Sequence, residues 1–98
     1  MAAELEIHPA ALEEIRLAVA WYRDRSESAA TRFVEEVDHA IAQIIHSPDR
    51  WPAGIAGSRK FVLQRFPFAV IYRANLFVIT VLAVAHGHRR PGYWRARL

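Results

Sequence analysis

The chain has 98 residues, of which 53% are hydrophobic and 23% charged, and it contains no cysteine. This length suits one domain over residues 1–98, and the balance of apolar and charged residues supports a packed core. Without cysteine the chain forms neither disulfides nor a thiolate nucleophile or metal site. No apolar run approaches the length of a membrane span, and the first ten residues lack the pattern of a signal peptide, so we expect a soluble cytoplasmic protein.

The two parts of the chain carry opposite charge. Residues 1–58 contain five Arg and ten acids, a net of −5, whereas residues 59–98 contain seven Arg, Lys60 and no acid, a net of +8; together these give the +3 of the whole chain. This division predicts a basic face suited to phosphate groups or to an acidic partner. Packing of the two parts against each other would neutralise some of this charge, but it would not explain why residues 59–98 contain no carboxylate side chain.

A short strand and a helix are predicted at the start of the chain. Residues 4–8 alternate in polarity, as in a strand with one buried face. Pro9 suits the first position of a helix because its missing N–H would have no partner there, and we expect this helix to end near Arg25. Glu13 and Glu14 are expected in its first turn, where the helix dipole favours acidic side chains.

The second predicted helix has one wide apolar stripe. The stripe runs from Ala30 to Ile45, and Ser28 is a candidate for the N-cap. The helix should end before Ser47-Pro48, and its short connection to the first helix predicts an antiparallel hairpin. The opposite face of this helix is acidic, with Glu35, Glu36 and Asp38. Three large aromatic residues are expected in the core: Trp21, Trp51 and Phe66.

In the last forty residues the period changes from helical to about two, which predicts three strands. They span residues 59–65, 68–73 and 77–86, and their short connections predict an antiparallel meander. The last strand is apolar on both sides, so we expect it in the interior of the sheet. The order β-α-α-β-β-β therefore predicts an α+β two-layer domain, with a helix hairpin packed on a small antiparallel sheet.

Three stretches of the sequence resemble the RelE/ParE superfamily of bacterial toxins, and the resemblance covers nearly the whole chain. The first helix ends in Ala20-Trp21-Tyr22 and is followed by a Phe33-xxx-Val37 stripe. Residues 66–73 read Phe-Pro-Phe-Ala-Val-Ile-Tyr-Arg, and residues 84–94 read Val-Ala-His-Gly-His-Arg-Arg-Pro-Gly-Tyr-Trp. In this superfamily the first strand lies beside the last in an antiparallel sheet.

The resemblance implies the toxin of a type II toxin–antitoxin pair, encoded on a plasmid or chromosome and held inactive by a cognate antitoxin encoded beside it. It leaves two targets open. ParE-like members inhibit DNA gyrase, and with it growth, without hydrolysing a substrate. RelE-like members are endoribonucleases that cut mRNA on the ribosome.

A ribonuclease would need a base for the attacking 2′-hydroxyl, an acid for the leaving oxygen and cations for the phosphate. His86 and His88 follow the last predicted strand and could act with Tyr93 in acid–base roles. Arg59 and Arg89 could bind the phosphate, and Arg59 and Arg65 could face the histidines across the sheet, at the same edge or nearby. By resemblance, Arg89 and Tyr93 occupy roughly the positions at which RelE-like nucleases carry an arginine and a tyrosine.

The charge of the second helix departs from the RelE-like pattern. RelE-like nucleases have a lysine-rich second helix and a catalytic lysine, whereas this chain has one lysine, Lys60, and an acidic second helix. An acidic helix face would repel ribosomal RNA, and arginine does not replace lysine as a proton donor. We therefore favour a ParE-like inhibitor of DNA gyrase, with the ribosome-dependent mRNA endoribonuclease as the alternative and an inactive or repurposed member of the same fold as a third reading.

A gyrase inhibitor would contact its target through basic and aromatic side chains. The candidates are Arg65, Arg73, Arg89, Arg90, Tyr93 and Trp94. The alternatives are a solvated basic tail and, for His86, a structural role at the end of a strand. The five histidines have no metal-ligand spacing, so no metal or cofactor is expected. The antitoxin is expected to bind as an extended or helical segment with apolar anchors and acidic charges.

Overall fold

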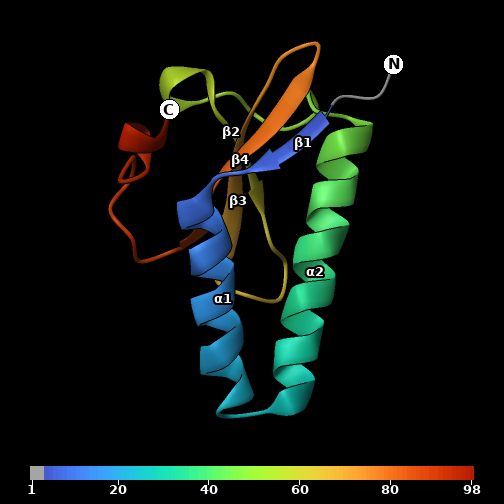
Figure 1. Cartoon of the computed structure of the whole chain (residues 1–98), viewed down its shortest axis with the longest axis vertical. Coiled ribbons are helices and arrows are strands. Elements are labelled where there is room, and N and C mark those ends of the chain that lie inside the picture. The colour runs from blue at the N-terminus through green and yellow to red at the C-terminus, as the bar shows by residue number, and fades with distance from the viewer. Residues whose placement is uncertain (1–3) are drawn as a thin grey trace.

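Two helices and four strands follow one another in the predicted order in the computed structural model, which describes residues 4–98 (Figure 1). The two helices pack on one face of the sheet, so the α+β class and the element order are confirmed. Among the described residues, neither helix combines the length and apolarity that crossing a membrane requires. The bounds are β1 Glu4–Ile7, α1 Pro9–Arg23, α2 Glu27–His46, β2 Arg59–Val62, β3 Phe68–Ala74 and β4 Val78–His86.

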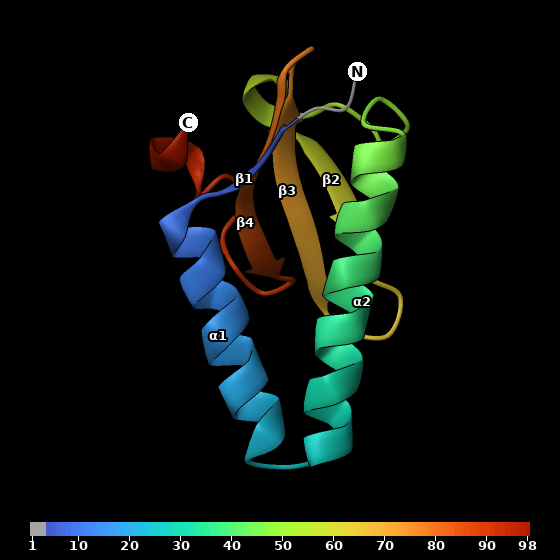
Figure 2. The same ribbon diagram turned by 45° about the vertical axis from the view of Figure 1, so that its right-hand side comes forward.

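The strands are arranged in the order β1-β4-β3-β2, which places β4 in the interior as predicted. β2, β3 and β4 form the expected antiparallel meander, but β1 pairs with β4 in parallel, with Glu4 opposite Val78 and Ile7 opposite Val81. The expectation of a wholly antiparallel sheet was therefore wrong. α1 continues in the direction of β1, and the chain then reverses at each of the next four connections, so β4 runs in the same direction as β1 (Figures 1 and 2).

Capping residues set the ends of the helices. The Nδ1 atom of His8 accepts a hydrogen bond from the Ala10 N–H at 3.0 Å, and α1 begins at Pro9. Glu13 and Glu14 consequently lie in the second turn, and the expectation that they occupy the first turn was wrong. For α2 the cap is Ser26, whose hydroxyl accepts from the Ala29 N–H at 3.1 Å, and not the predicted Ser28. Ser26 is extended, so the helix begins directly after it.

β2 ends three residues earlier than predicted because a side chain of α2 forms hydrogen bonds with the turn that follows it. The Glu36 carboxylate accepts from the backbone N–H groups of Gln64 at 2.7 Å and Arg65 at 3.0 Å. These donors are therefore turned toward α2 and are not available to a strand partner. Glu36, which was expected on the acidic outer face of the helix, instead fixes the β2–β3 connection.

The main core lies between the helices and the sheet. The stripe of α2 supplies Phe33, Val37 and Ile44, and the sheet supplies Val70, Tyr72, Ile79, Val81 and Val84. Trp51 and Phe66 are partly buried against this cluster. Trp21 was expected in the core, but it is 53% exposed. Its neighbour Tyr22 takes the inward position and packs on Phe33 and Phe66, and residues adjacent in a helix point about 100° apart.

A second, smaller cluster lies on the sheet face that the helices leave open. Ala69, Ile71, Leu82 and Ala83 come from β3 and β4, and Trp94 from the end of the chain covers them. Ile71 pairs with Ala83 and Tyr72 with Val81, so Leu82 is an extra residue in β4 without a partner in β3. Such a bulge twists the strand and redirects its backbone groups, which brings Leu82 into contact with the chain terminus.

Candidate functional site

The C-terminal segment, residues 87–98, folds back against the open face of the sheet and the beginning of α1 (Figure 1). Trp94 is only 4% exposed and packs in the second cluster with Ile71 and Leu82. Tyr93 is partly buried beside it. Arg89, Arg90 and Arg95 therefore project from an anchored part of the surface, and the segment is not a solvated tail.

Glu14 of α1 holds this segment in place. Its carboxylate accepts hydrogen bonds from the Tyr93 hydroxyl at 2.6 Å and from the Arg97 guanidinium at 2.8 and 3.1 Å. It also accepts from the backbone N–H of Val84 in β4 at 3.1 Å, while Arg97 donates to the Leu82 carbonyl at 3.0 Å. The side chains of Glu14 and Arg97 are each 16% exposed. We refer to Glu14, Tyr93 and Arg97 as the clasp.

The clasp replaces a missing strand. β1 ends opposite Val81, whereas β4 continues to His86, so within residues 4–98 the later residues of β4 have no strand neighbour on the β1 side. Buried backbone groups need hydrogen-bond partners. The clasp supplies them, since Glu14 accepts from Val84 and Arg97 donates to Leu82. The same contacts that complete the edge of β4 thus fix the position of the C-terminal segment.

The clasp also changes the ionisation of its members. Burial, together with the hydrogen bond to the Glu14 carboxylate, raises the pKa of Tyr93 to about 12. Burial would raise the pKa of Glu14, but the hydrogen bonds from Arg97, Tyr93 and Val84 outweigh it, and the pKa is lowered. The hydrogen bond with Glu14 raises the pKa of Arg97. Around neutral pH the clasp is a carboxylate, a guanidinium and a neutral phenol that donates to the carboxylate.

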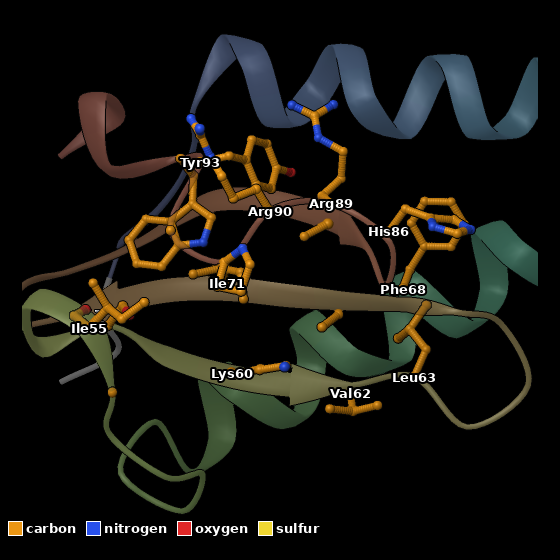
Figure 3. Close-up of a pocket in the computed structure, with 18 of the residues that line it drawn as sticks. Ile55, Lys60, Val62, Leu63, Phe68, Ile71, His86, Arg89, Arg90 and Tyr93 are labelled. Carbon is orange, nitrogen blue, oxygen red and sulfur yellow. Dashed lines mark hydrogen bonds between the residues drawn. The ribbon is translucent and has the colours of Figure 1, made fainter.

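A groove of about 500 Å³ crosses the open face between β2, β3 and the C-terminal segment (Figure 3). We name it the open-face groove. Its floor is apolar, with Ile71 and Val62, and Val62 is 60% exposed. Lys60 lies on the β2 side, and Arg89 and Arg90 lie on the opposite side. All three cations are exposed, so the groove combines an apolar floor with a basic rim.

Four of the five residues in the predicted ribonuclease set lie close together, since His86, Arg89 and Tyr93 line one pocket and the His86 and His88 rings are 5.1 Å apart, but the guanidinium of Arg59 does not join them. The Arg59 guanidinium donates to the carbonyls of Trp51 at 2.6 Å and Asp49 at 3.3 Å, so it anchors the loop before β2. Arg59 is in register with Tyr72 of β3, whereas His86 is in register with Phe68. This offset is about 13 Å along the strands and about 10 Å across them. The expectation that Arg59 faces the histidines is therefore wrong.

His86 lies at the end of β4 on the side of the helices. Its ring packs edge-on against Phe68, with centroids 5.0 Å apart, and its Nδ1 atom accepts from the His88 N–H at 3.1 Å. His88 itself is exposed. Within residues 4–98, no group of three or more His, Asp or Glu side chains could hold a metal ion. The His86 ring is thus held by contacts that explain it as a strand-end residue.

The predicted contact residues fall into separate groups. Arg89, Arg90 and Tyr93 lie together, and the Arg89 guanidinium stacks on the Tyr93 ring at 3.9 Å. Arg65 is in the β2–β3 turn, bordering α2, and Arg73 is near the other end of β3, opposite Thr80. Both are exposed but remote from each other. The indole of Trp94 is buried in the second cluster, but Trp94 still lines the open-face groove beside Tyr93.

Sequence reasoning missed Glu14 and treated Arg97 as part of a basic tail. One signal was present. Glu14 is three residues after Ala11 and four before Ala18, both of which are buried, so it lies on the flank of the buried helix face. A carboxylate in such a place needs a partner. Nothing in the local sequence indicates that the partner is more than eighty residues away.

The fold is shared with a solved toxin–antitoxin structure, described as the chromosomal ParDE TA system from P. aeruginosa. It has a TM-score of 0.76 and 17% sequence identity, over 87% of this chain and 96% of that chain. No curated protein sequence matches the chain significantly. The profile of the family described as "ParE toxin of type II toxin-antitoxin system, parDE" matches residues 5–91. The fold is thus that of a toxin–antitoxin toxin, and the chain belongs to the ParE toxin family.

Proposed function

We propose that this ParE-family toxin inhibits DNA gyrase by direct contact, through the open-face groove and the adjoining Arg89 and Arg90, and that a cognate antitoxin neutralises it. The observation that carries the proposal is the contrast between two residue sets. The basic side chains beside the groove are exposed and gathered, whereas two groups that RNA cleavage would need are engaged by the protein itself: Tyr93 donates to Glu14, and Arg59 donates to loop carbonyls. Such a toxin would contribute to plasmid stabilisation by arresting cells that lose its antitoxin.

The state of Tyr93 argues against a nuclease. Its hydroxyl donates to Glu14, and its pKa is raised to about 12. A general acid works best with a pKa near the operating pH. The guanidinium of Arg59 is engaged by loop carbonyls. Of the two arginines predicted to bind the phosphate, Arg89 is therefore the one left beside His86 and His88.

The charge of the open-face groove supports a contact surface. Among residues 4–98, neither Arg89 nor Arg90 makes an ion pair with a carboxylate. An apolar floor bordered by unpaired cations fits a protein surface with apolar and acidic residues. Since residues 59–98 contain no acid, the groove itself offers no internal partner for these charges.

The test compares purified wild-type toxin with two double variants. Arg89→Gln/Arg90→Gln should weaken inhibition of gyrase supercoiling by about tenfold, at about 1 kcal/mol or less for each rim charge. The matched control is Arg16→Gln/Arg23→Gln, which removes the same charge from exposed ion pairs of α1 and should inhibit like wild type. Ribosome-dependent mRNA fragments from wild-type toxin, with gyrase unaffected, would instead establish the endoribonuclease.

A further inference from the structure

A second groove runs along α1, on the other side of the C-terminal segment. It has a volume of about 420 Å³, and we name it the α1 groove. Leu17 and Trp21 of α1 form one wall. The other wall comes from the ends of β3 and β4 and from the C-terminal segment, and includes Phe68, His86, Arg89 and Tyr93. In Figure 3 the Arg89 side chain extends from the C-terminal segment toward α1, and Arg89 lines both grooves.

The α1 wall exposes large apolar side chains. Leu17 is 54% and Trp21 53% exposed, and they are four residues apart, so they lie on the same side of the helix. A contiguous exposed apolar patch beside polar residues marks an interaction site more often than isolated apolar residues do. Trp is also the residue type most enriched among the side chains that dominate binding energy. These features distinguish the α1 groove from the more polar surface of α2.

Two arginines border this apolar wall. The Arg25 guanidinium lies 3.6 Å from the centre of the Trp21 ring, and that of Arg89 lies 3.9 Å from the centre of the Tyr93 ring. In the described chain neither arginine makes an ion pair with a carboxylate. Glu14 lies at the groove wall, but its oxygens are engaged by the clasp. The groove therefore has an apolar wall with Arg89 in its lining and with Arg25 stacked on Trp21, and in the described chain neither cation has a carboxylate partner.

We infer that the α1 groove is the seat of the antitoxin, which inserts an amphipathic segment with apolar anchors against Leu17 and Trp21 and carboxylates at Arg25 and Arg89. Apolar anchors at helical spacing with charges at the ends are the mode by which a helix binds a groove. The site of antitoxin binding does not depend on the target of the toxin, but the effect of this binding on gyrase rests on the proposed function. Arg89 lines both grooves, so an antitoxin seated here withdraws Arg89 from the surface proposed to contact gyrase.

The first measurement is calorimetric binding of the antitoxin encoded beside the toxin gene. Trp21→Ala and, separately, Leu17→Ala should raise Kd by about 30-fold or more for the Trp and about tenfold for the Leu, as for central anchors of an interface. Leu12→Ala is the matched control, because Leu12 is 57% exposed on the same helix but does not line the groove. It should stay within about threefold of wild type. All three side chains are more than half exposed, so the variants should fold, which circular dichroism checks.

Charge is tested with Arg25→Gln against Arg23→Gln. Arg25→Gln should slow association and reduce the salt dependence of binding, since rim charges act mainly on the rate of encounter. Arg23 pairs with Glu27 and does not border the groove, so Arg23→Gln should leave both quantities near wild type. Equal effects of the two variants would indicate a general attraction between the proteins and would overturn the assignment of the carboxylates to this groove.

A gyrase assay separates this inference from the proposed function. Trp21→Ala should inhibit gyrase like wild type, but a concentration of antitoxin that relieves the wild-type toxin should fail to relieve the variant. Unchanged antitoxin affinity in both Trp21→Ala and Leu17→Ala would overturn the inference, and so would loss of gyrase inhibition with antitoxin binding intact. A wild-type toxin without effect on gyrase would refute the proposed function alone, because the antitoxin affinities would still show whether the antitoxin binds in the α1 groove.

Discussion

Replacing Glu14 by glutamine removes the charge at the centre of the clasp while keeping the size of the side chain. The Arg97 guanidinium, whose side chain is 16% exposed, would lose its counter-charge. The neutral amide cannot accept from Tyr93, Arg97 and Val84 as the carboxylate does, and its NH₂ group faces donors. Strained or lost hydrogen bonds are therefore expected at the edge of β4 and at the chain terminus together.

The magnitude follows from the contacts. Hydrogen bonds to a charged group contribute about 1.5–3 kcal/mol each, and breaking a fully buried ion pair costs about 3–5 kcal/mol. The clasp is partly exposed, which reduces the loss, so we expect Glu14→Gln to lower the free energy of unfolding by about 2–3 kcal/mol. For a chain of this length that corresponds to a fall in Tm of roughly 10–20 °C. Urea and thermal unfolding followed by circular dichroism measure both quantities.

The loss should depend on pH in a defined direction. The pKa of Glu14 is lowered in the folded protein from its ordinary value of 4.5. Its contribution to stability is therefore complete above pH 4.5 and is lost as the pH falls through the folded pKa. The difference between wild type and Glu14→Gln should be largest at neutral pH and should shrink below pH 4.5.

Glu13→Gln is the matched control for this experiment. Glu13 is adjacent in α1 and pairs with Arg16, but both side chains are more than half exposed. Exposed ion pairs contribute little to stability, so this variant should unfold at the wild-type midpoint. If Glu14→Gln and Glu13→Gln unfolded alike, or if the Glu14→Gln difference persisted unchanged at pH 3, the clasp would not stabilise the fold as we argue.

Three further substitutions test individual contacts. His86→Gln keeps an acceptor for the His88 N–H and should lower the free energy of unfolding by about 1 kcal/mol or less. The variant should still arrest growth. A loss of about 10²–10⁴ in the rate of mRNA cleavage would instead identify His86 as a general acid or base. Trp94→Ala removes the largest side chain of the second cluster and should lower the free energy of unfolding by about 3–5 kcal/mol in urea titrations. Tyr93→Phe should remove the phenol that ionises near pH 12 from the ultraviolet titration curve, and a curve unchanged from wild type would contradict the raised pKa.

Local patterns were sufficient for the elements of the fold. The apolar stripe of α2 and the alternation in β3 are repeated over several turns or residue pairs, and each repeat adds to the same conclusion. The interior position of β4 followed from apolar residues on both of its faces. The motifs at residues 66–73 and 84–94 indicated the superfamily, which the family match over residues 5–91 bears out.

Features that depend on contacts between distant residues were decided by the tertiary structure. The parallel pairing of β1 with β4 depends on how many times the intervening chain reverses, not on the composition of either strand. Arg59 and His86 are compatible as a pair by residue type, but the registers of β2 and β4 on β3 separate them. Glu14 is bound to Arg97 at the edge of β4 because no strand pairs with the backbone groups there in the described chain, and Trp94 is buried because it covers apolar residues on the sheet face that the helices leave open. Periodicity reports which face of an element is buried, whereas long-range register determines which side chains meet there.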